Sequence, residues 1–160
     1  MRIAVTTSRV LYEGLTEQAR SIAEELSIPY VPRNDLSLKE LSNNNKLDYL
    51  LVVEKNQVIV KGPAENFKWH PNLAMTRLKS LHSGQTDHMI EAMGLQEGFQ
   101  VLDCTLGLGA DALVVAYGVG ATGHVTGLES SPVIAFITRW GLQNYQGENK
   151  NIKTLTERIT

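Results

Sequence analysis

The sequence predicts an α/β protein in which parallel strands alternate with helices, preceded by a small α/β module. The first observation is a mostly apolar, β-favouring run from Gln100 to Leu106, which we expect to be a buried strand, followed by a helix-length apolar run from Ala110 to Tyr117. The second is a β-rich run from His124 to Leu128, with another helical segment after it. Strand, helix, strand, helix is the beginning of a doubly wound parallel sheet, which binds ligands at the carboxyl ends of its strands.

The composition is that of an ordinary globular protein. The chain has 160 residues, of which 42% are apolar and 20% charged, and its net charge is −2. These values give no overall attraction to nucleic acid or to anionic membranes. The single cysteine, Cys104, excludes an internal disulfide and suits the reducing cytoplasm, where we expect the protein to act. We expect no signal peptide, because the N-terminus lacks a long enough apolar core, and no membrane span, because the sequence has no run of about 18 apolar residues.

Residues 1–66 are predicted to form the small α/β module. Apolar and β-branched runs predict strands at residues 2–6, 30–31, 49–53 and 57–61, the last two joined as a hairpin. Apolar residues at three- and four-residue spacing predict a helix over residues 15–26, ended by Ile28-Pro29. Ser37 and Glu40 fit a capping box, so a short helix should begin there. Residues 43–45, all asparagine, should form a polar loop.

Residues 67–160 contain the predicted parallel sheet. An aromatic-rich connector, residues 67–71, should lead to a helix capped by Asn72 and broken at Ser83-Gly84. A second helix should end at Gly94. Ser131 is a good N-cap with Pro132 at the first helical position, so a helix should run from there to about residue 145. Residues 147–150 should form a polar turn, and residues 152–160 stay unassigned.

The strand-to-helix junction at residues 101–111 predicts a nucleotide-type binding loop. Gly107 and Gly109 stand where the chain must turn sharply, and glycine permits both unusual backbone angles and close approach of a ligand. Residues 107–112 match the dinucleotide pattern G-x-G-x-x-A, which is weak evidence alone. Glu129 ends the second strand 20 residues after Gly109, where a carboxylate accepts hydrogen bonds from ribose hydroxyls. Sites for NAD and for S-adenosylmethionine both use such a carboxylate.

Two further carboxylates favour a cationic ligand. Asp103 precedes the glycines, where its charge would repel a dinucleotide pyrophosphate. S-adenosylmethionine has no phosphate and carries an ammonium and a sulfonium, so acidic groups beside it are favourable. Asp111 lies in the first turn of the helix and could face the cationic methionine end. Two plainer interpretations stay open: Asp103 as a structural cap of the loop, and Asp111 as an ordinary acid at a helix N-terminus.

These residues resemble the S-adenosylmethionine motifs of class I methyltransferases. The resemblance is carried by Asp103-x-Thr105-x-Gly107-x-Gly109-x-Asp111-Ala112, followed by Leu128-Glu129-x-Ser131-Pro132-Val133. It is closest to the bacterial family that includes the small-subunit ribosomal RNA guanine-N2 methyltransferase. It covers roughly residues 67–145, and residues 1–66 match only in general character. The expected fold is therefore a Rossmann-like class I methyltransferase sheet, here incomplete, behind a small N-terminal module.

The resemblance implies a set of cofactor contacts and a type of chemistry. Five residues would surround the methionine part of S-adenosyl-L-methionine: Asp103, Thr105, Gly107, Gly109 and Asp111. Glu129 would bind the ribose, and Ser130 and Ser131 would lie by the adenine. Methyl transfer would be direct, with the protein supplying positioning and electrostatics and no metal. The expected substrate is a guanine base nitrogen of ribosomal RNA.

The chain departs from this family after Pro132. Families that methylate a base nitrogen usually carry an Asp/Asn-Pro-Pro-aromatic-like motif at the end of the fourth strand, which in the family that this chain resembles is similar to Asp-Pro-x-aromatic-Pro. No proline follows Pro132 here. We therefore expect a truncated, inactive piece of the enzyme, with its catalytic residues unassigned and beyond Thr160. The exposed edge of an incomplete sheet could pair with a second copy to form a homodimer. Two alternatives remain: an NAD-type Rossmann oxidoreductase domain and a non-catalytic nucleotide-binding module.

Residues 68–88 are the one locally basic and aromatic stretch. They contain Lys68, Trp69, His70, Arg77, Lys79, His82 and His88, with Asp87 as the only acid. This stretch could contact RNA phosphates or stack on a base, although a solvated helix face with core aromatics is the favoured interpretation. Its histidines lack a zinc spacing, so no metal is expected. Cys104 should be a small core residue, and Arg9 and Tyr12 should belong to a simple loop after the first strand.

Overall fold

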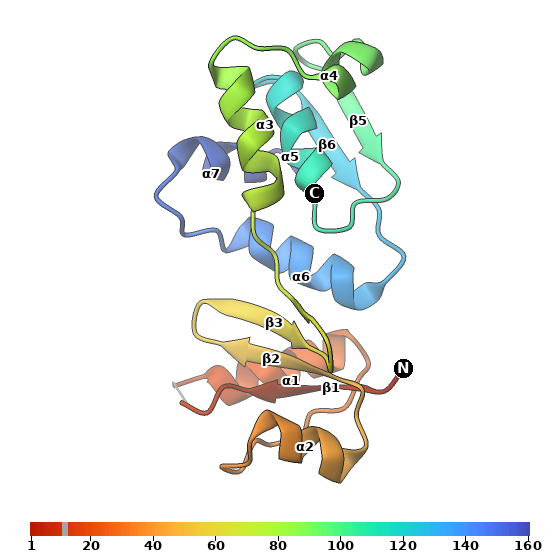
Figure 1. Ribbon diagram of the computed structural model, residues 1–160, viewed down its shortest axis with the longest axis vertical. Helices are drawn as coiled ribbons and strands as arrows, with labels where there is room; N and C mark the ends of the chain where they lie inside the picture. The colour runs from red at the N-terminus through yellow and green to blue at the C-terminus, as the bar shows by residue number, and fades with distance from the viewer. Residues whose placement is uncertain (11–12) are drawn as a thin grey trace. The chain divides into compact units, whose positions relative to one another are not determined.

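The computed structural model describes residues 1–10 and 13–160, without the side chain of Leu73, and the fold is mixed α/β. The chain divides into two compact units, Met1–Lys68 and Trp69–Thr160 (Figure 1). No helix among the described residues is long and apolar enough to cross a membrane. Tyr12 lies outside the described residues.

The first unit is a four-stranded sheet with two helices. The strands are β1 (Ile3–Thr7), β2 (Tyr49–Glu54), β3 (Gln57–Lys61) and β4 (Asn66–Phe67), in that order across the sheet. β1 is parallel to β2, whereas β2, β3 and β4 are antiparallel. Helix α1 (Leu15–Glu25) packs on β1 and β2, and α2 (Leu38–Asn45) packs on β2. The buried central strands alternate their side chains between the two faces, which lets each helix cover one of them.

Several expectations for this unit are confirmed and three are wrong. The Ser37–Glu40 capping box is present, because each side chain accepts the other residue's backbone N–H. Residues 43–45 are not a loop: they continue α2, which ends only at Lys46 in a left-handed conformation. Residues 30–31 form no strand but a single bridge between Tyr30 and Val5. Phe67 pairs with Val60 in the sheet, so it is part of β4 and not of a connector.

The second unit is a short parallel sheet with helices on one face. β5 (Gln100–Asp103) is parallel to β6 (His124–Gly127), and a parallel bridge from Val125 to Ile159 adds a third chain segment. Helices α3 (Asn72–His82), α4 (His88–Met93), α5 (Ala110–Gly118), α6 (Pro132–Gln143) and α7 (Lys150–Thr156) complete the unit. α3 and α7 pack on α5, which covers β5 and β6 (Figure 1). The core therefore lies between α5 and one face of the sheet.

The other face of this sheet is uncovered, which corrects the expectation of a buried strand over residues 100–106. β5 ends at Asp103, and Leu102 is 57% exposed because no element of the described chain packs over it. Cys104 lies just after β5 and is exposed, so it is not a core residue. Asn72 begins α3 but does not cap it, since the N-cap is Pro71. Lys150, expected in a turn, begins α7.

Candidate functional site

The loop between β5 and α5 is shaped by two glycines in the left-handed region. Gly107 has φ of 53° and Gly109, the N-cap of α5, has φ of 72°. A side chain at either position would be strained, which is why the sequence has glycine at both. The loop thus runs from the carboxyl end of β5 directly into the first turn of α5. Its main chain is open to close approach by a ligand, because a Cβ at Gly107 would meet nothing closer than 3.8 Å.

Thr138 of α6 binds this loop through a hydrogen bond to its backbone. Its hydroxyl donates a hydrogen bond of 2.7 Å to the Gly107 carbonyl, and the side chain is fully buried. Its methyl group lies 3.4 Å from where a Cβ of Gly109 would be, so the helix and the loop are in close contact. Sequence reasoning missed Thr138, since a threonine inside an apolar helix gives no spacing signal for a contact 31 residues away.

Glu129 follows β6 and joins the two strand ends. One carboxylate oxygen accepts the Gly107 N–H at 3.0 Å, and the other accepts the Ser131 N–H at 2.8 Å. The hydrogen bond from the Ser131 N–H, and to a smaller extent that from the Gly107 N–H, holds the pKa of Glu129 below its ordinary value. The Ser130 hydroxyl adds a hydrogen bond of 3.3 Å. Because a carboxylate has about four acceptor positions, Glu129 keeps one for a further donor such as a hydroxyl.

Asp103 caps the loop from the end of β5. Its side chain accepts the Thr105 N–H at 2.9 Å, and its carbonyl accepts the Leu128 N–H at 2.7 Å. The second bond extends the β5–β6 pairing beyond the strands and brings Asp103 beside the segment that carries Glu129. Both contacts of Asp103 are therefore those of a residue that caps the loop. Thr105 is exposed and reaches Asp103 through its backbone N–H.

Ser131 and Ser130 lie at the start of α6. The Ser131 side chain accepts the Ile134 N–H at 3.4 Å, and Pro132 occupies the first turn, as the sequence predicts. Ser130 is exposed, with its hydroxyl directed to Glu129. Both serines therefore stand next to the carboxylate at the end of β6.

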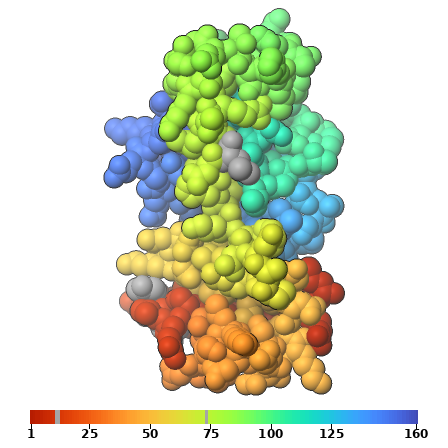
Figure 2. Space-filling model, in the orientation of Figure 1, coloured from red at the N-terminus to blue at the C-terminus, as the bar shows by residue number. Residues whose placement is uncertain are grey.

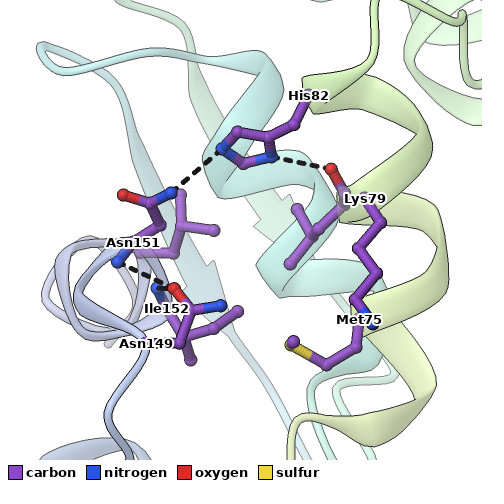
Figure 3. Close-up of a pocket in the computed structure, with 8 residues that line it drawn as sticks. Met75, Lys79, His82, Asn149, Asn151 and Ile152 are labelled. Atoms are coloured by element: carbon purple, nitrogen blue, oxygen red, sulfur yellow. Dashed lines mark hydrogen bonds between the residues drawn. The ribbon is translucent and has the colours of Figure 1, made fainter.

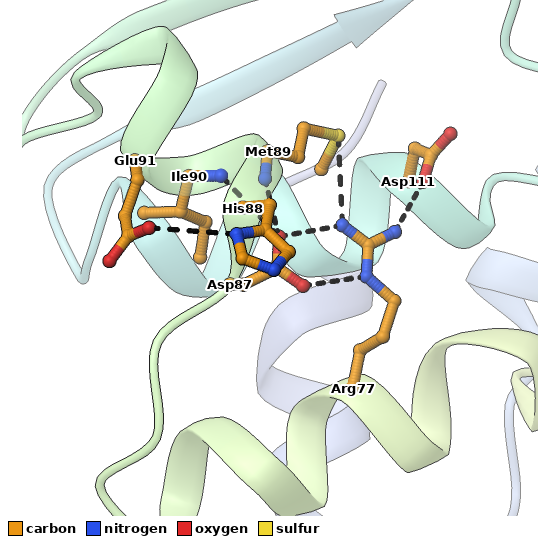
Figure 4. A network of polar contacts seen from close by, with 7 residues as sticks. All are labelled: Arg77, Asp87, His88, Met89, Ile90, Glu91 and Asp111. Carbon is orange, nitrogen blue, oxygen red and sulfur yellow. Dashed lines mark hydrogen bonds and ion pairs between the residues drawn. The ribbon is translucent and has the colours of Figure 1, made fainter.

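Asp111 is not a free carboxylate. Figure 4 shows it paired with Arg77 of α3, whose Nη1 lies 2.5 Å from the Asp111 carboxylate. The same guanidinium donates to both oxygens of Asp87, at 2.7 and 2.8 Å. The bond from Arg77 lowers the pKa of Asp87 to about 2, and that bond also raises the pKa of Arg77. Sequence reasoning placed Arg77 and Asp87 only in the basic stretch, and nothing in their spacing links them to Asp111.

The remaining residues of the basic stretch are divided between the core and the surface. Trp69 packs with its ring edge against Tyr145, 5.8 Å between centroids, and its Nε1 is buried with no hydrogen-bond partner among the described residues. His70 and His88 are exposed. No group of three or more acidic, histidine or cysteine side chains in the described chain is placed to hold a metal ion. In the first unit, Arg9 donates to the Asp35 carbonyl at 3.0 Å.

A separate pocket of about 250 Å³ lies between α3 and α7 (Figure 3). Lys79, His82 and Asn151 contribute polar groups over an apolar floor that includes Leu78 and Ile152. The His82 ring lies between the Leu78 carbonyl at 2.7 Å and the Asn151 amide at 3.3 Å. None of the predicted cofactor residues lines this pocket, so the glycine loop remains the candidate site.

Comparisons with known proteins show the family and the fold of the chain. Residues 36–160 match the family described as "Putative SAM-dependent methyltransferase". The chain is 34% identical over 155 residues to the uncharacterized protein YpiP of Bacillus subtilis strain 168; the match covers 97% of this chain and 60% of that protein. It also resembles the crystal structure of the SAM-dependent methyltransferase NGO1261 from Neisseria gonorrhoeae, with a TM-score of 0.56, 19% identity, and coverage of 98% of this chain and 56% of that one. At this identity the second likeness shows the fold.

Proposed function

Because the chain belongs to this family of SAM-dependent methyltransferases, we propose that its glycine loop and Glu129 bind S-adenosylmethionine for methyl transfer to a ribosomal RNA base. The family implies the cofactor, and the proposal assigns it to particular residues. The observation that carries it is the direct bond between Glu129 and the Gly107 N–H. That bond unites the glycine turn after β5 with the acidic end of β6, which is where a doubly wound sheet binds its ligand.

The backbone conformation and the charges of the loop support this assignment. The positive φ angles of Gly107 and Gly109 bring bare main chain to the surface of the loop. Glu129 keeps an acceptor position for a ribose hydroxyl, with Ser130 and Ser131 beside it for the adenine. Asp103 and Asp111 supply negative charge for the ammonium and sulfonium of the methionine part, whereas two carboxylates would disfavour the pyrophosphate of NAD.

In the proposed reaction the protein mainly positions the cofactor for methyl transfer. S-adenosylmethionine supplies a methyl group activated by its sulfonium. The chain's own residues bind and orient the ligand: Thr138 and Glu129 hold the loop in shape, and Asp103 caps it. Preorganised groups of this kind lower the barrier because they need not rearrange during the reaction. The catalytic residues stay unassigned, since the 160 residues contain no Asp-Pro-x-aromatic-Pro segment.

The proposed substrate is a guanine nitrogen of ribosomal RNA, contacted by residues 68–88. Supporting this, the segment coloured yellow-green to green, which contains α3 and α4, forms much of the surface of the second unit on the face in Figure 2. His70, Lys79 and His88 are exposed and can contact phosphates. Trp69 contributes to the core instead, so base stacking is not part of the proposal.

Transfer of a labelled methyl group tests the substrate. The purified protein is incubated with methyl-tritiated S-adenosylmethionine and deproteinised small-subunit ribosomal RNA, and the RNA is digested to nucleosides. Any label that is transferred should be in a methylguanosine, and Glu129→Gln should reduce it, since an amide cannot accept both backbone N–H groups. Label in protein or in a small molecule would contradict the RNA assignment. Cofactor binding without any transfer would agree both with the expectation of an inactive piece and with the non-catalytic binding module.

A further inference from the structure

Asp87 fixes the position of the Arg77 side chain, which also contacts Asp111 beside the glycine loop. Asp87 is the N-cap of α4, accepting the Met89 and Ile90 N–H groups at 3.0 and 3.4 Å. Its two oxygens also accept from Nε and Nη2 of Arg77. These two hydrogen bonds to one carboxylate fix the plane of the guanidinium, and they therefore also fix the direction in which its third nitrogen, Nη1, points. In Figure 4 that nitrogen points at Asp111.

One donor of this guanidinium is left over. Of its five N–H groups, Nε and one on Nη2 go to Asp87, the second on Nη2 faces the Met89 sulfur at 3.8 Å, and one on Nη1 goes to Asp111. The second N–H of Nη1 has no partner among the described residues. It lies beside Asp111, two residues after Gly109, so a free donor and a charged pair adjoin the loop.

Asp111 is the solvent-exposed member of this network. Its side chain is 67% exposed, against 32% for Arg77 and 11% for Asp87. Only one of its two oxygens has a partner in the described chain. The three side chains together carry a charge of −1, and S-adenosylmethionine, with a carboxylate, an ammonium and a sulfonium, carries +1. An ion pair of this kind is complementary to the zwitterionic end of an amino acid.

Building on the proposed function, we propose that Arg77 and Asp111 together bind the α-amino-acid end of S-adenosylmethionine. Nη1 of Arg77 donates to the α-carboxylate, and Asp111 accepts from the α-ammonium. Asp87 is a positioning residue, because it acts by fixing the guanidinium. Asp111 thus keeps the role that its place in the sequence suggests, but only as one half of a pair.

Calorimetry with two ligands isolates this contact. S-adenosylhomocysteine and 5′-methylthioadenosine share the adenosine and a neutral thioether, but only the first has the amino-acid group. Arg77→Met should weaken S-adenosylhomocysteine binding about 10-fold or more and change methylthioadenosine binding less than about 2-fold. Asp111→Asn should give the same selective loss and leaves the Arg77–Asp87 pair intact, so it covers the case in which Arg77→Met does not fold. Lys153→Met, which removes an exposed positive charge from α7, is the control and should change neither.

The outcomes separate this inference from the proposed function. If the unsubstituted chain does not bind S-adenosylhomocysteine, the proposed function fails and the inference fails with it. If the chain binds but Arg77→Met and Asp111→Asn leave the affinity unchanged, only the inference is overturned. Equal weakening of both ligands also overturns it, because that pattern marks a general role in holding the loop.

Discussion

Thr138 shows how one side chain in an apolar helix can shape a binding loop. Its hydroxyl is buried and satisfies the Gly107 carbonyl at the turn where the backbone has positive φ. The helix thereby fixes the direction of this carbonyl, and Glu129 separately fixes the Gly107 N–H, which belongs to the preceding peptide group. Two long-range hydrogen bonds, one to the peptide group on each side of Gly107, therefore give this loop a defined form.

Thr138→Val should destabilise the protein by about 1 kcal/mol, because it keeps the shape of the side chain but leaves the Gly107 carbonyl without this partner. Thermal denaturation measures the change. Thr126→Val is the control: Thr126 is exposed on β6, so its substitution should have little effect on the free energy of unfolding. An equal effect of the two substitutions would mean that the bond to Gly107 contributes nothing specific.

The ion pair between Asp87 and Arg77 should make the free energy of unfolding depend on pH in acidic solution. The bond from Arg77 lowers its pKa to about 2, whereas an unfolded aspartate titrates near about 3.9. A lowered pKa means that the stabilisation is complete above about pH 4 and is lost as the pH falls towards 2. Asp87→Asn keeps a capping side chain, so the difference in unfolding free energy from the unsubstituted protein isolates the ion pair.

That difference should be about 1 kcal/mol at neutral pH, a modest value because Arg77 is partly exposed to solvent. It should shrink to nothing as the pH falls from about 4 to about 2. Chemical denaturation at a series of pH values from 2 to 7 measures it. A difference that does not vary over this range would contradict the ion-pair account.

Among the elements, the start of α5 depends on Gly109, the glycine at its N-cap. Gly109→Ala should cost about 1 kcal/mol, because alanine is strained at φ of 72°, and should also weaken S-adenosylhomocysteine binding. Gly94→Ala is a matched control: Gly94 ends α4 at φ of 57°, and a Cβ there would meet nothing within 4 Å. It should lower thermal stability similarly while leaving binding intact. Weaker binding in both variants would attribute the loss to stability and not to the loop.

Elements set by local chemistry could be predicted from the sequence, and those set by tertiary packing could not. The capping box at Ser37 and the Ser131-Pro132 start of α6 are confirmed because they depend on residues within one turn. The three asparagines predicted as a loop are helical, since the capped helix continues past buried Leu41 and the Asn45 amide bonds back to the Leu41 carbonyl. Arg77 and Thr138 reach partners more than 30 residues away, a distance that no local pattern encodes.

At the scale of the second unit, no element of the described chain covers one face of the parallel sheet. Val125 is buried beneath the helices, but Leu102, Phe99 and Leu128 are exposed. Parallel sheets in folded proteins are normally covered on both faces. The sequence could not predict this exposure, because an apolar strand looks the same whether or not something packs over it. The outer edge of β5 is also unpaired within the described chain.

We propose that a second copy of the chain pairs along β5, since an unpaired edge strand beside apolar residues favours such addition. Sedimentation velocity at increasing protein concentration should then show a monomer–dimer equilibrium. Leu102→Lys should shift this equilibrium to the monomer, whereas Val10→Lys, which charges an exposed apolar residue of the first unit, should not. A monomer at every concentration would exclude this pairing.

The proposed function depends on which ligand the glycine loop binds. Titration calorimetry of the chain with S-adenosylhomocysteine and, separately, with NADH tests it most directly. We expect saturable binding of S-adenosylhomocysteine that Glu129→Gln weakens, and no binding of NADH, because Asp103 and Asp111 would lie against its pyrophosphate. Binding of NADH without binding of S-adenosylhomocysteine would contradict the assignment of the loop.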